Sequence, residues 1–294
     1  MTEPAPSFPE ASVIAITGAS GLVGRSLHRQ LTAHGHRVIT LTRRPAQGDD
    51  ERQWSLAGFD LSGVDAVIHL AGESIASGLW TTARKRAILE SRVDGTRAIS
   101  RACGRDGVRR LLCASAVGFY GDRGEEALDE SGSRGSGFLS DVCTAWEDAA
   151  SGPGPLEVAH LRFGQILSWE GGALSVQARL YRLGMGARLG SGRQWMPWIS
   201  LVDACNAIEH ALNRNLEGAL NVVSPVPARQ EELHHILCTQ LHRPRFPVAP
   251  EFLLRLLPGG FGKELLLTSA RVTPKRLTDT GFAWSHPRIA DALK

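Results

Sequence analysis

A glycine-rich turn joins a short apolar run to an amphipathic stretch near the start of the chain, and few folds accept that combination. The run covers residues 13–17, and the turn TGASGLVG at 17–24 carries Gly18, Gly21 and Gly24 at intervals of three. Apolar side chains then recur at helical spacing, namely Leu22, Val23, Leu27 and Leu31. The first glycine permits a tight turn, the second lets a pyrophosphate approach the helix start, and the third lets the helix pack closely. This order predicts a dinucleotide site; the alternative is an ordinary tight turn of an α/β protein.

The residues after the second expected strand indicate which dinucleotide would bind. That strand is expected at 37–41, and sites for NAD carry Asp or Glu at its end to bind the ribose 2′-hydroxyl. Here Arg43 and Arg44 follow instead, and the first acid is Asp49. An arginine holds a 2′-phosphate through a charge-assisted contact worth about 1.5–3 kcal/mol. The sequence therefore predicts NADP(H), with a pair of solvated loop arginines as the alternative.

Strands and helices alternate as far as Phe163. Further strands are expected at 66–70, 110–114, 158–163 and 220–223, and helices at 83–103, 137–150 and 201–214. Continuous apolar strands alternating with helices predict an α/β fold with a Rossmann-type doubly wound parallel sheet and a smaller C-terminal α/β domain. The expected divisions are a flexible tail at 1–12, a Rossmann domain of 13–168 plus 199–223, and a smaller domain of 169–198 plus 224–294.

Composition excludes several classes of protein. The 294 residues carry 33 Lys+Arg and 30 Asp+Glu, a formal net charge of +3 spread along the chain, so a nucleic-acid partner is not expected. The longest apolar runs are too short to span a membrane, and residues 1–12 lack the apolar core of a signal peptide. The five cysteines form no Cys-x-x-Cys pair, which fits reduced structural thiols in the cytoplasm and no metal site.

Several longer motifs occur in a fixed order along the chain. They include DAVIHLAGE at 65–73, RVDGT at 92–96, ASAVGFYG at 114–121, LRFGQIL at 161–167, SGRQWMPWISLVDA at 191–204 and ELLLTSARVTPKRL at 264–277. With the glycine turn, this order resembles an extended short-chain dehydrogenase/reductase, in the atypical branch named epimerase family proteins or sugar-nucleotide epimerase-like proteins. The resemblance implies an NADP-binding Rossmann domain, a small C-terminal substrate domain, a small-molecule substrate and a monomer or homodimer.

The chain departs from that family at one motif. Active short-chain dehydrogenases use Tyr-x-x-x-Lys, in which the lysine lowers the tyrosine pKa and binds the nicotinamide ribose. Neither Tyr120 nor Tyr181 has a lysine four residues later, and alignment places Leu139 at the Tyr position and Cys143 at the Lys position. We expect an oxidoreductase or epimerase-like enzyme with another acid–base group, or a non-catalytic NADP(H)-binding sensor or partner-binding protein. A true nucleotide-sugar epimerase would have lost its usual base.

Three residues are candidates for the missing acid–base chemistry. By the resemblance, Ser115 is the active-site serine at a strand end; the alternative is a serine that caps the strand. Tyr120 lies in a loop expected beside the nicotinamide, and a packing or hydrogen-bonding tyrosine is equally compatible. Glu73 follows a strand at the carboxyl edge of the sheet, where it would act as base or anchor a substrate hydroxyl, or simply start a helix.

Other positions carry weaker signals. By the resemblance, Arg92 stands where many extended members carry Asn, and it would bind an anionic substrate group or pair with an acid such as Glu73 or Glu90. His69 lies in an apolar strand and is expected to be a buried, hydrogen-bonded histidine, and Gln194–Trp198 would wall the substrate cleft or form a seam between domains. The expected cofactor contacts are Gly18, Ser20, Gly21, Leu22, Val23, Gly24, Arg43, Arg44, Leu70, Ala71, Gly72, Arg92, Arg162, Phe163 and Gly164.

Overall fold

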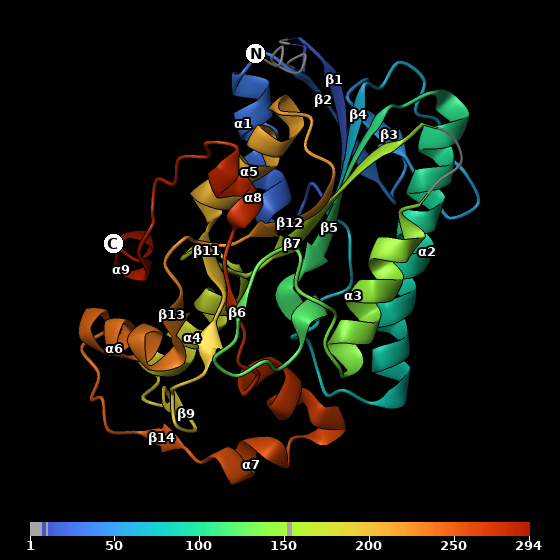
Figure 1. Ribbon diagram of the computed structural model, residues 1–294. Coiled ribbons are helices and arrows are strands. Elements are labelled where there is room, and N and C mark those ends of the chain that lie inside the picture. Colours follow the sequence, from blue (N-terminus) through green and yellow to red (C-terminus); the bar gives the residue numbers. More distant parts are fainter. Residues whose placement is uncertain (1–7, 10, 152–154) are drawn as a thin grey trace.

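A central parallel sheet organises the computed structural model, which describes residues 8–9, 11–151 and 155–294. Within these residues, seven strands form the sheet in the order β12-β7-β5-β4-β1-β2-β3 (Figure 1). They are β1 (Val13–Thr17), β2 (Arg37–Thr42), β3 (Glu51–Gln53), β4 (Ala66–His69), β5 (Arg110–Ala116), β7 (Glu157–Phe163) and β12 (Gly218–Val222). The prediction of a Rossmann-type, doubly wound sheet is confirmed.

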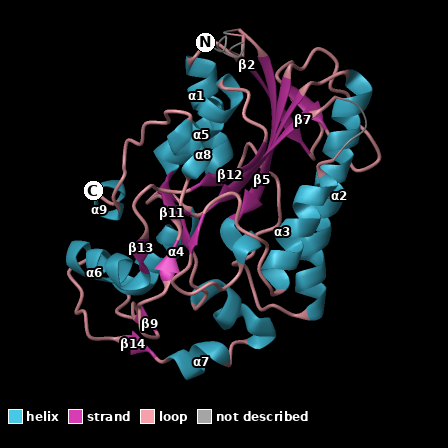
Figure 2. Cartoon of the chain, in the orientation of Figure 1, coloured by secondary structure: helices cyan, strands magenta, loops and turns pink. Residues whose placement is uncertain are grey.

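Helices cover both faces of the sheet, as a buried parallel sheet requires. The helices α1 (Leu22–Ala33) and α5 (Leu201–Asn213) lie on one face, and α2 (Thr82–Asp106) and α3 (Phe138–Ala149) on the other (Figure 2). Strand residues alternate between the two faces: Ile14 and Ile16 belong to the core beneath α1 and α5, whereas Ala15 belongs to the core beneath α2. The alternation explains why these strands read as continuous apolar runs.

The strand order reverses at β1, which has β2 on one side and β4 on the other. In open α/β sheets, ligands bind outside the carboxyl ends of the strands at such a switch point. The turn at 17–24 follows β1 and the loop at 70–73 follows β4. Both sequence motifs therefore lie at the edge of the sheet where this fold binds ligands.

The remaining described strands are short and pair in twos. The pairs are β6 (Ala127–Leu128) with β15 (Arg271–Val272), β8 (Gln165–Leu167) with β11 (Trp198–Ser200), β9 (Arg188–Leu189) with β14 (Val248–Ala249), and β10 (Trp195–Met196) with β13 (Ala228–Arg229). They are accompanied by α4 (Gly172–Arg182), α6 (Gln230–Gln240), α7 (Glu251–Arg255), α8 (Lys275–Asp279), α9 (Ile289–Ala292) and the short turns η1 (Val117–Tyr120), η2 (Pro258–Gly260) and η3 (Gly262–Leu266). The helix α8 packs on β12, and its Leu277 joins the core beneath α1 and α5, although the sequence assigned this segment to the smaller domain.

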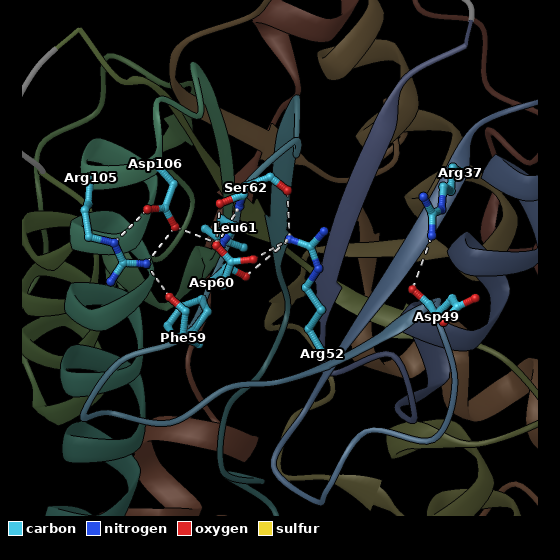
Figure 3. Close-up of polar contacts among 9 residues, drawn as sticks. All are labelled: Arg37, Asp49, Arg52, Phe59, Asp60, Leu61, Ser62, Arg105 and Asp106. Atoms are coloured by element: carbon cyan, nitrogen blue, oxygen red, sulfur yellow. Dashed lines mark hydrogen bonds and ion pairs between the residues drawn. The ribbon is translucent and has the colours of Figure 1, made fainter.

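The edge strand β3 was not expected, because its residues Glu-Arg-Gln are all polar. It pairs with β2, and side chains fix the loop that follows it (Figure 3). Arg52 Nη1 donates to the Ser62 carbonyl at 3.0 Å, Arg105 Nη2 donates to the Phe59 carbonyl, and Asp106 Oδ2 accepts the Leu61 N–H at 2.8 Å. Contacts with distant residues therefore stabilise β3 and the loop after it, although the strand has no apolar side chains.

The start of the chain differs from the flexible tail expected at 1–12, of which residues 1–7 and 10 lie outside the described residues. Phe8 packs against the core and its N–H donates to the Asn213 carbonyl at 3.4 Å, while Ser12 is buried. The described part of this segment is therefore packed. Among the described helices, none combines the length and the apolar character that a membrane crossing requires.

Candidate functional site

The glycine turn after β1 has the geometry that its spacing predicts. Gly18 has a φ of 69°, a left-handed conformation that favours glycine, and its carbonyl accepts the Gly21 N–H at 2.9 Å. A Cβ on Gly24 would lie 2.3 Å from the Gly18 carbonyl oxygen, so only glycine lets α1 begin this close to the turn. The first N–H groups of α1 have no acceptor within the helix, and a helix start of this kind attracts anions.

The loop after β4 is bound directly to this turn. Thr17 Oγ1 accepts the N–H groups of Leu70 at 3.1 Å and Ala71 at 3.2 Å, and lies 2.7 Å from His69 Nδ1. Two N–H groups occupy both acceptor positions of the hydroxyl, so its hydrogen goes to His69 Nδ1 and the ring carries its own proton on Nε2. Burial lowers the pKa of His69 to about 4, which keeps the ring neutral. This is the buried, hydrogen-bonded histidine that the sequence predicted.

The carboxyl end of β2 presents two exposed arginines, Arg43 and Arg44. The nearby acids are engaged elsewhere: Asp50 pairs with Arg37 at 3.0 Å, and Glu51 accepts the Gln47 N–H at 2.8 Å. Figure 3 shows Asp49 beside Arg37, whose Nη2 donates to the Asp49 carbonyl at 3.3 Å. Arg37 starts β2, so this contact lies toward the amino edge, away from the strand end that carries Arg43.

A shallow, open depression of about 560 Å³ lies beside the glycine turn. It is lined by Ala19, Ser20, Arg25, His28, Arg29, Thr40 and Glu170. Arg25 Nη1 donates to the Ser20 carbonyl at 2.6 Å, so a guanidinium borders the turn itself. Two arginines against one carboxylate give the depression a positive character.

A chain of buried hydrogen bonds joins β5, β7, β12 and α3. The Ser115 hydroxyl donates to Glu147 Oε1 at 2.7 Å, and Arg162 donates to both oxygens of the same carboxylate, each at 2.8 Å. Arg162 Nη1 also donates to the Tyr120 hydroxyl at 3.0 Å, and that hydroxyl donates to Asn221 Oδ1 at 2.8 Å. Every polar group in this chain of contacts has a protein partner.

Three of the expected site residues are buried. Tyr120 is 0% exposed, Ser115 3% and Arg162 5%. Burial raises the pKa of Tyr120, an effect that the neighbouring Arg162 opposes. The Tyr120 hydroxyl accepts a hydrogen bond from Arg162 and donates one to Asn221, and the Ser115 hydroxyl donates to Glu147. The Arg162 guanidinium carbon lies 3.5 Å from the centre of the Phe119 ring, and each guanidinium nitrogen donates to a protein group; the expected cofactor contact stays a prediction.

Gly164 lies against the backbone of the segment at 197–198. A Cβ at this position would lie 2.8 Å from the carbonyl carbon of Pro197, and the Gly164 N–H donates to the Val222 carbonyl at 3.1 Å. Its neighbour Phe163 packs, partly buried, against the core of the sheet. The missing side chain of Gly164 therefore makes room for residues 197–198, and the expected cofactor contact stays a prediction.

Glu73 is the exposed member of the three acid–base candidates, with 44% of its side chain accessible. Its Oε1 pairs with Arg84 Nη1 at 2.8 Å, and Arg84 Nη2 donates to the Ser74 carbonyl. Arg92 Nη1 donates to the Glu73 carbonyl at 2.9 Å and not to the carboxylate. The charged groups of α2 thus border the loop after β4.

The positions aligned with the lost Tyr and Lys hold apolar or unreactive groups. A Cβ on Gly118 would lie 3.4 Å from Leu139 Cβ and 3.6 Å from Cys143 Sγ, so both residues pack against η1. Burial raises the pKa of the Cys143 thiol to about 12, and this group stays protonated at neutral pH. Neither residue supplies acid–base chemistry.

The aromatic stretch at 194–198 forms a seam between distant segments. Trp195 Nε1 donates to Glu125 Oε2 at 2.8 Å, and Glu125 also pairs with Arg229 at 3.0 Å. The guanidinium carbons of Arg229 and Arg271 lie 4.1 and 5.2 Å from the centre of the Trp195 ring. Ser269 Oγ accepts the Trp195 N–H at 3.0 Å and donates to the Gly124 carbonyl at 2.9 Å. We call Glu125, Trp195, Arg229, Ser269 and Arg271 the Trp195 clasp.

Sequence reasoning missed three residues that organise this region: Thr17, Glu147 and Asn221. Glu147 carried a signal, because it is an acid beside the buried Trp146 on a largely apolar helix. Thr17 and Asn221 lie within apolar strands, and nothing in their spacing reveals their partners. In the described part of the chain, no group of His, Cys, Asp and Glu side chains is placed to hold a metal ion.

Two family models match parts of the chain. The NAD dependent epimerase/dehydratase family matches residues 14–136, and a domain of unknown function, DUF1731, matches residues 249–294. The first match contains the glycine turn and β5, and the second contains most of the C-terminal segment that packs against β6 and β12.

Similar proteins cover nearly the whole chain. Epimerase family protein MT2273 of Mycobacterium tuberculosis is 38% identical over 290 residues, or 96% of each chain. The crystal structure of human epimerase family protein SDR39U1 (isoform 2) with NADPH is 30% identical, with a TM-score of 0.89 and coverage of 96% of this chain and 98% of the human chain. A nucleoside-diphosphate sugar epimerase from Corynebacterium glutamicum is 32% identical, with a TM-score of 0.81 and coverage of 98% of this chain and 58% of that chain. The chain therefore belongs to the epimerase family proteins, atypical extended short-chain dehydrogenases/reductases in which an NAD-dependent epimerase/dehydratase domain precedes a DUF1731 domain.

Proposed function

We propose that this protein binds NADP(H) at the carboxyl edge of its sheet and acts as an oxidoreductase or epimerase-like enzyme on a small carbonyl or hydroxyl compound. The observation that carries the proposal is the exposed pair Arg43 and Arg44 at the end of β2, next to the glycine turn. A guanidinium there favours a 2′-phosphate over a 2′-hydroxyl. The human relative SDR39U1 was crystallised with NADPH, which supports the same preference.

The two ends of the cofactor would meet different parts of this edge. The start of α1, at Gly21 and Leu22, would bind the pyrophosphate, and the backbone of Leu70, Ala71 and Gly72 would border the nicotinamide half. Bound NADPH would supply a hydride from C4 of its nicotinamide. We assign the substrate side to the segments 169–198 and 224–294.

For the proton, we assign Glu73. It is the exposed one of the three candidates, and Arg84 holds its carboxylate in place at 2.8 Å. Ser115 and Tyr120 are removed from this role because their hydroxyl groups are buried and donate to protein partners. A carboxylate at this position would move a proton to or from the substrate oxygen.

A second candidate function is a non-catalytic NADP(H)-binding sensor or partner-binding protein. The observation in its favour is the pair of unreactive groups, Leu139 and Cys143, at the positions of the lost Tyr and Lys. Both candidate functions require the same cofactor site, so they differ only in whether the protein converts a substrate. A screen of carbonyl compounds for NADPH consumption, run with wild type and Glu73→Gln, separates them.

The cofactor site is tested by titrating the protein with NADPH and with NADH and following reduced-nicotinamide fluorescence. We expect NADPH to bind about 10- to 100-fold more tightly, the factor that 1.5–3 kcal/mol corresponds to. Arg43→Ala should remove most of this preference by weakening NADPH and leaving NADH nearly unchanged. Arg86→Ala is the matched control, since Arg86 is exposed on α2 and pairs with Glu90. Equal losses for both cofactors in Arg43→Ala would refute the 2′-phosphate role.

A further inference from the structure

Arg92 is fixed on the inner side of α2 by contacts that leave its charge uncompensated. Its Nη1 donates to the carbonyls of Glu73 at 2.9 Å and Ile88 at 3.2 Å, and its Cζ lies 4.9 Å from the centre of the Trp146 ring. These contacts hold the guanidinium plane in one orientation. None of these partners carries a negative charge toward it.

The nearest carboxylate does not neutralise Arg92. Glu73 gives its Oε1 to Arg84 Nη1 at 2.8 Å, and no ion pair to Arg92 forms within the described residues. Burial is the main cause that lowers the pKa of Arg92; the charge of Glu73 opposes this effect in part, and the charge of Arg84 adds to it. A partly buried guanidinium without an ion-pair partner is destabilising, and an anionic ligand would supply that partner.

Two nitrogens of Arg92 remain available for such a ligand. Only Nη1 donates a hydrogen bond to a described residue. Some described side chains have buried nitrogen or oxygen atoms without a hydrogen-bond partner, but Nε and Nη2 of Arg92 are not among these atoms. Nε and Nη2 lie on one edge of the guanidinium, the fork that matches the two oxygens of a carboxylate or phosphate. Arg92 is therefore held in place through Nη1, while its Nε and Nη2 are available to a ligand.

Arg92 contacts a different element from those proposed for the phosphates of the cofactor. A Cβ on Gly72 would lie 3.5 Å from Arg92 Cζ, so the guanidinium rests against the loop after β4. Arg92 also lies near Cys143: burial raises the pKa of that thiol, and the positive charge of Arg92 opposes this effect. The pyrophosphate and 2′-phosphate sites proposed above belong to the start of α1 and the end of β2. An anion at Arg92 would therefore be part of the substrate.

We propose that Arg92 binds a carboxylate or phosphate group of the substrate, so that the protein acts on an anionic small molecule. This inference rests on the proposed function for the identity of the substrate side. It predicts an anion site that stays open when the adenosine half of the cofactor site is filled.

The test uses the whole protein saturated with adenosine 2′,5′-bisphosphate, which fills the Arg43 end of the site. Malonate and inorganic phosphate are then titrated by calorimetry at constant ionic strength, with neutral malonamide as the comparison. The variants are Arg92→Gln, Arg92→Lys and the control Arg86→Gln, an exposed residue of the same helix. Circular dichroism and the Tm of each variant show that it is folded.

We expect wild type and Arg86→Gln to bind malonate or phosphate, and malonamide not to bind. Arg92→Gln should weaken the anion at least tenfold while leaving adenosine 2′,5′-bisphosphate unchanged, and Arg92→Lys should restore part of the affinity because it restores the charge. Equal anion affinity in Arg92→Gln and wild type would overturn the inference, as would an Arg92→Gln loss that extends equally to the bisphosphate. If the bisphosphate itself fails to bind wild type, the proposed cofactor site fails, and the same anion titrations on the free protein still test Arg92.

Discussion

The Thr17 hydroxyl and the His69 ring fix the loop that follows β4 to the end of β1. Thr17 lies 2.7 Å from His69 Nδ1 and accepts two backbone N–H groups from that loop. Both residues are 0% exposed, and His69 Nε2 has no partner within the described chain. A protonated ring would add a charge to this dry environment, so the loop geometry depends on a neutral His69.

Acid should therefore destabilise the protein through His69. Its pKa is about 4 in the folded state and 6.5 in the unfolded state, so only the unfolded chain takes up a proton between these values. The free energy of unfolding should fall by up to about 3 kcal/mol from pH 6.5 to pH 4, with no further loss from this group below pH 4. Urea unfolding at several pH values, compared with His69→Gln, isolates the contribution. His235→Gln, an exposed site on α6, is the control, and parallel curves for wild type and His69→Gln would contradict the assignment.

Within single elements, backbone proximity decides which residues are permitted. The first turn of α1 lies so close to the glycine turn that a Cβ on Gly24 would stand 2.3 Å from the Gly18 carbonyl oxygen and 2.7 Å from Ala19 Cα. Both contacts are with backbone, which cannot rotate away as a side chain does. The helix and the turn therefore occupy their positions only with glycine at this point.

Gly24→Ala should consequently change both stability and cofactor binding. Displacing α1 from the turn should lower the free energy of unfolding by about 1–3 kcal/mol, and NADPH affinity should fall at least tenfold because the helix start moves. Thr32→Ala, on the exposed side of the same helix, should change stability by less than about 0.5 kcal/mol and leave NADPH binding intact. Chemical denaturation and fluorescence titration measure both effects. If Gly24→Ala is destabilised but binds NADPH as tightly as wild type, the glycine turn is not part of the cofactor site.

Across the whole molecule, the Trp195 clasp ties the loop after η1 to segments 70, 104 and 145 residues further along the chain. Its ion pair and its indole hydrogen bond meet at Glu125, and the hydrogen bond from Trp195 is the main reason that the pKa of this carboxyl is lowered. The clasp also connects Gly124 with Ser269 at 2.9 Å. Of the two roles expected for residues 194–198, the seam is the one that these contacts describe.

Trp195→Ala should loosen this connection without unfolding the central sheet. We expect a loss of about 2–4 kcal/mol in the free energy of unfolding, from the removed indole and its contacts with two guanidinium groups. Hydrogen exchange should rise in residues 122–126 and 269–271 and stay unchanged in β1 and β4. Trp169→Ala removes an indole that is 36% exposed and serves as the control. Unaltered exchange in both segments would show that the clasp does not hold them.

The main elements follow from local physical requirements that a sequence displays. Apolar runs alternating with amphipathic stretches need a sheet covered on both faces, and β1, α1, β2, β5 and α5 lie within a few residues of their expected bounds. The glycines at 18, 21 and 24 are required by backbone geometry within a single turn. The edge strand β3 was missed because distant side chains such as Arg105 hold its loop.

Patterns among neighbouring residues are enough to predict the doubly wound sheet, the glycine turn, the arginines after β2 and each of the family motifs. Which polar side chains are free depends on contacts between distant elements. Tyr120 and Ser115 match the family motif, yet Asn221, Arg162 and Glu147 from other elements bind their hydroxyl groups in the interior. Arg92 lies near Glu73, yet that carboxylate is taken by Arg84. Hydrogen-bond partners come from across the fold, so the availability of a polar group is a property of the whole molecule.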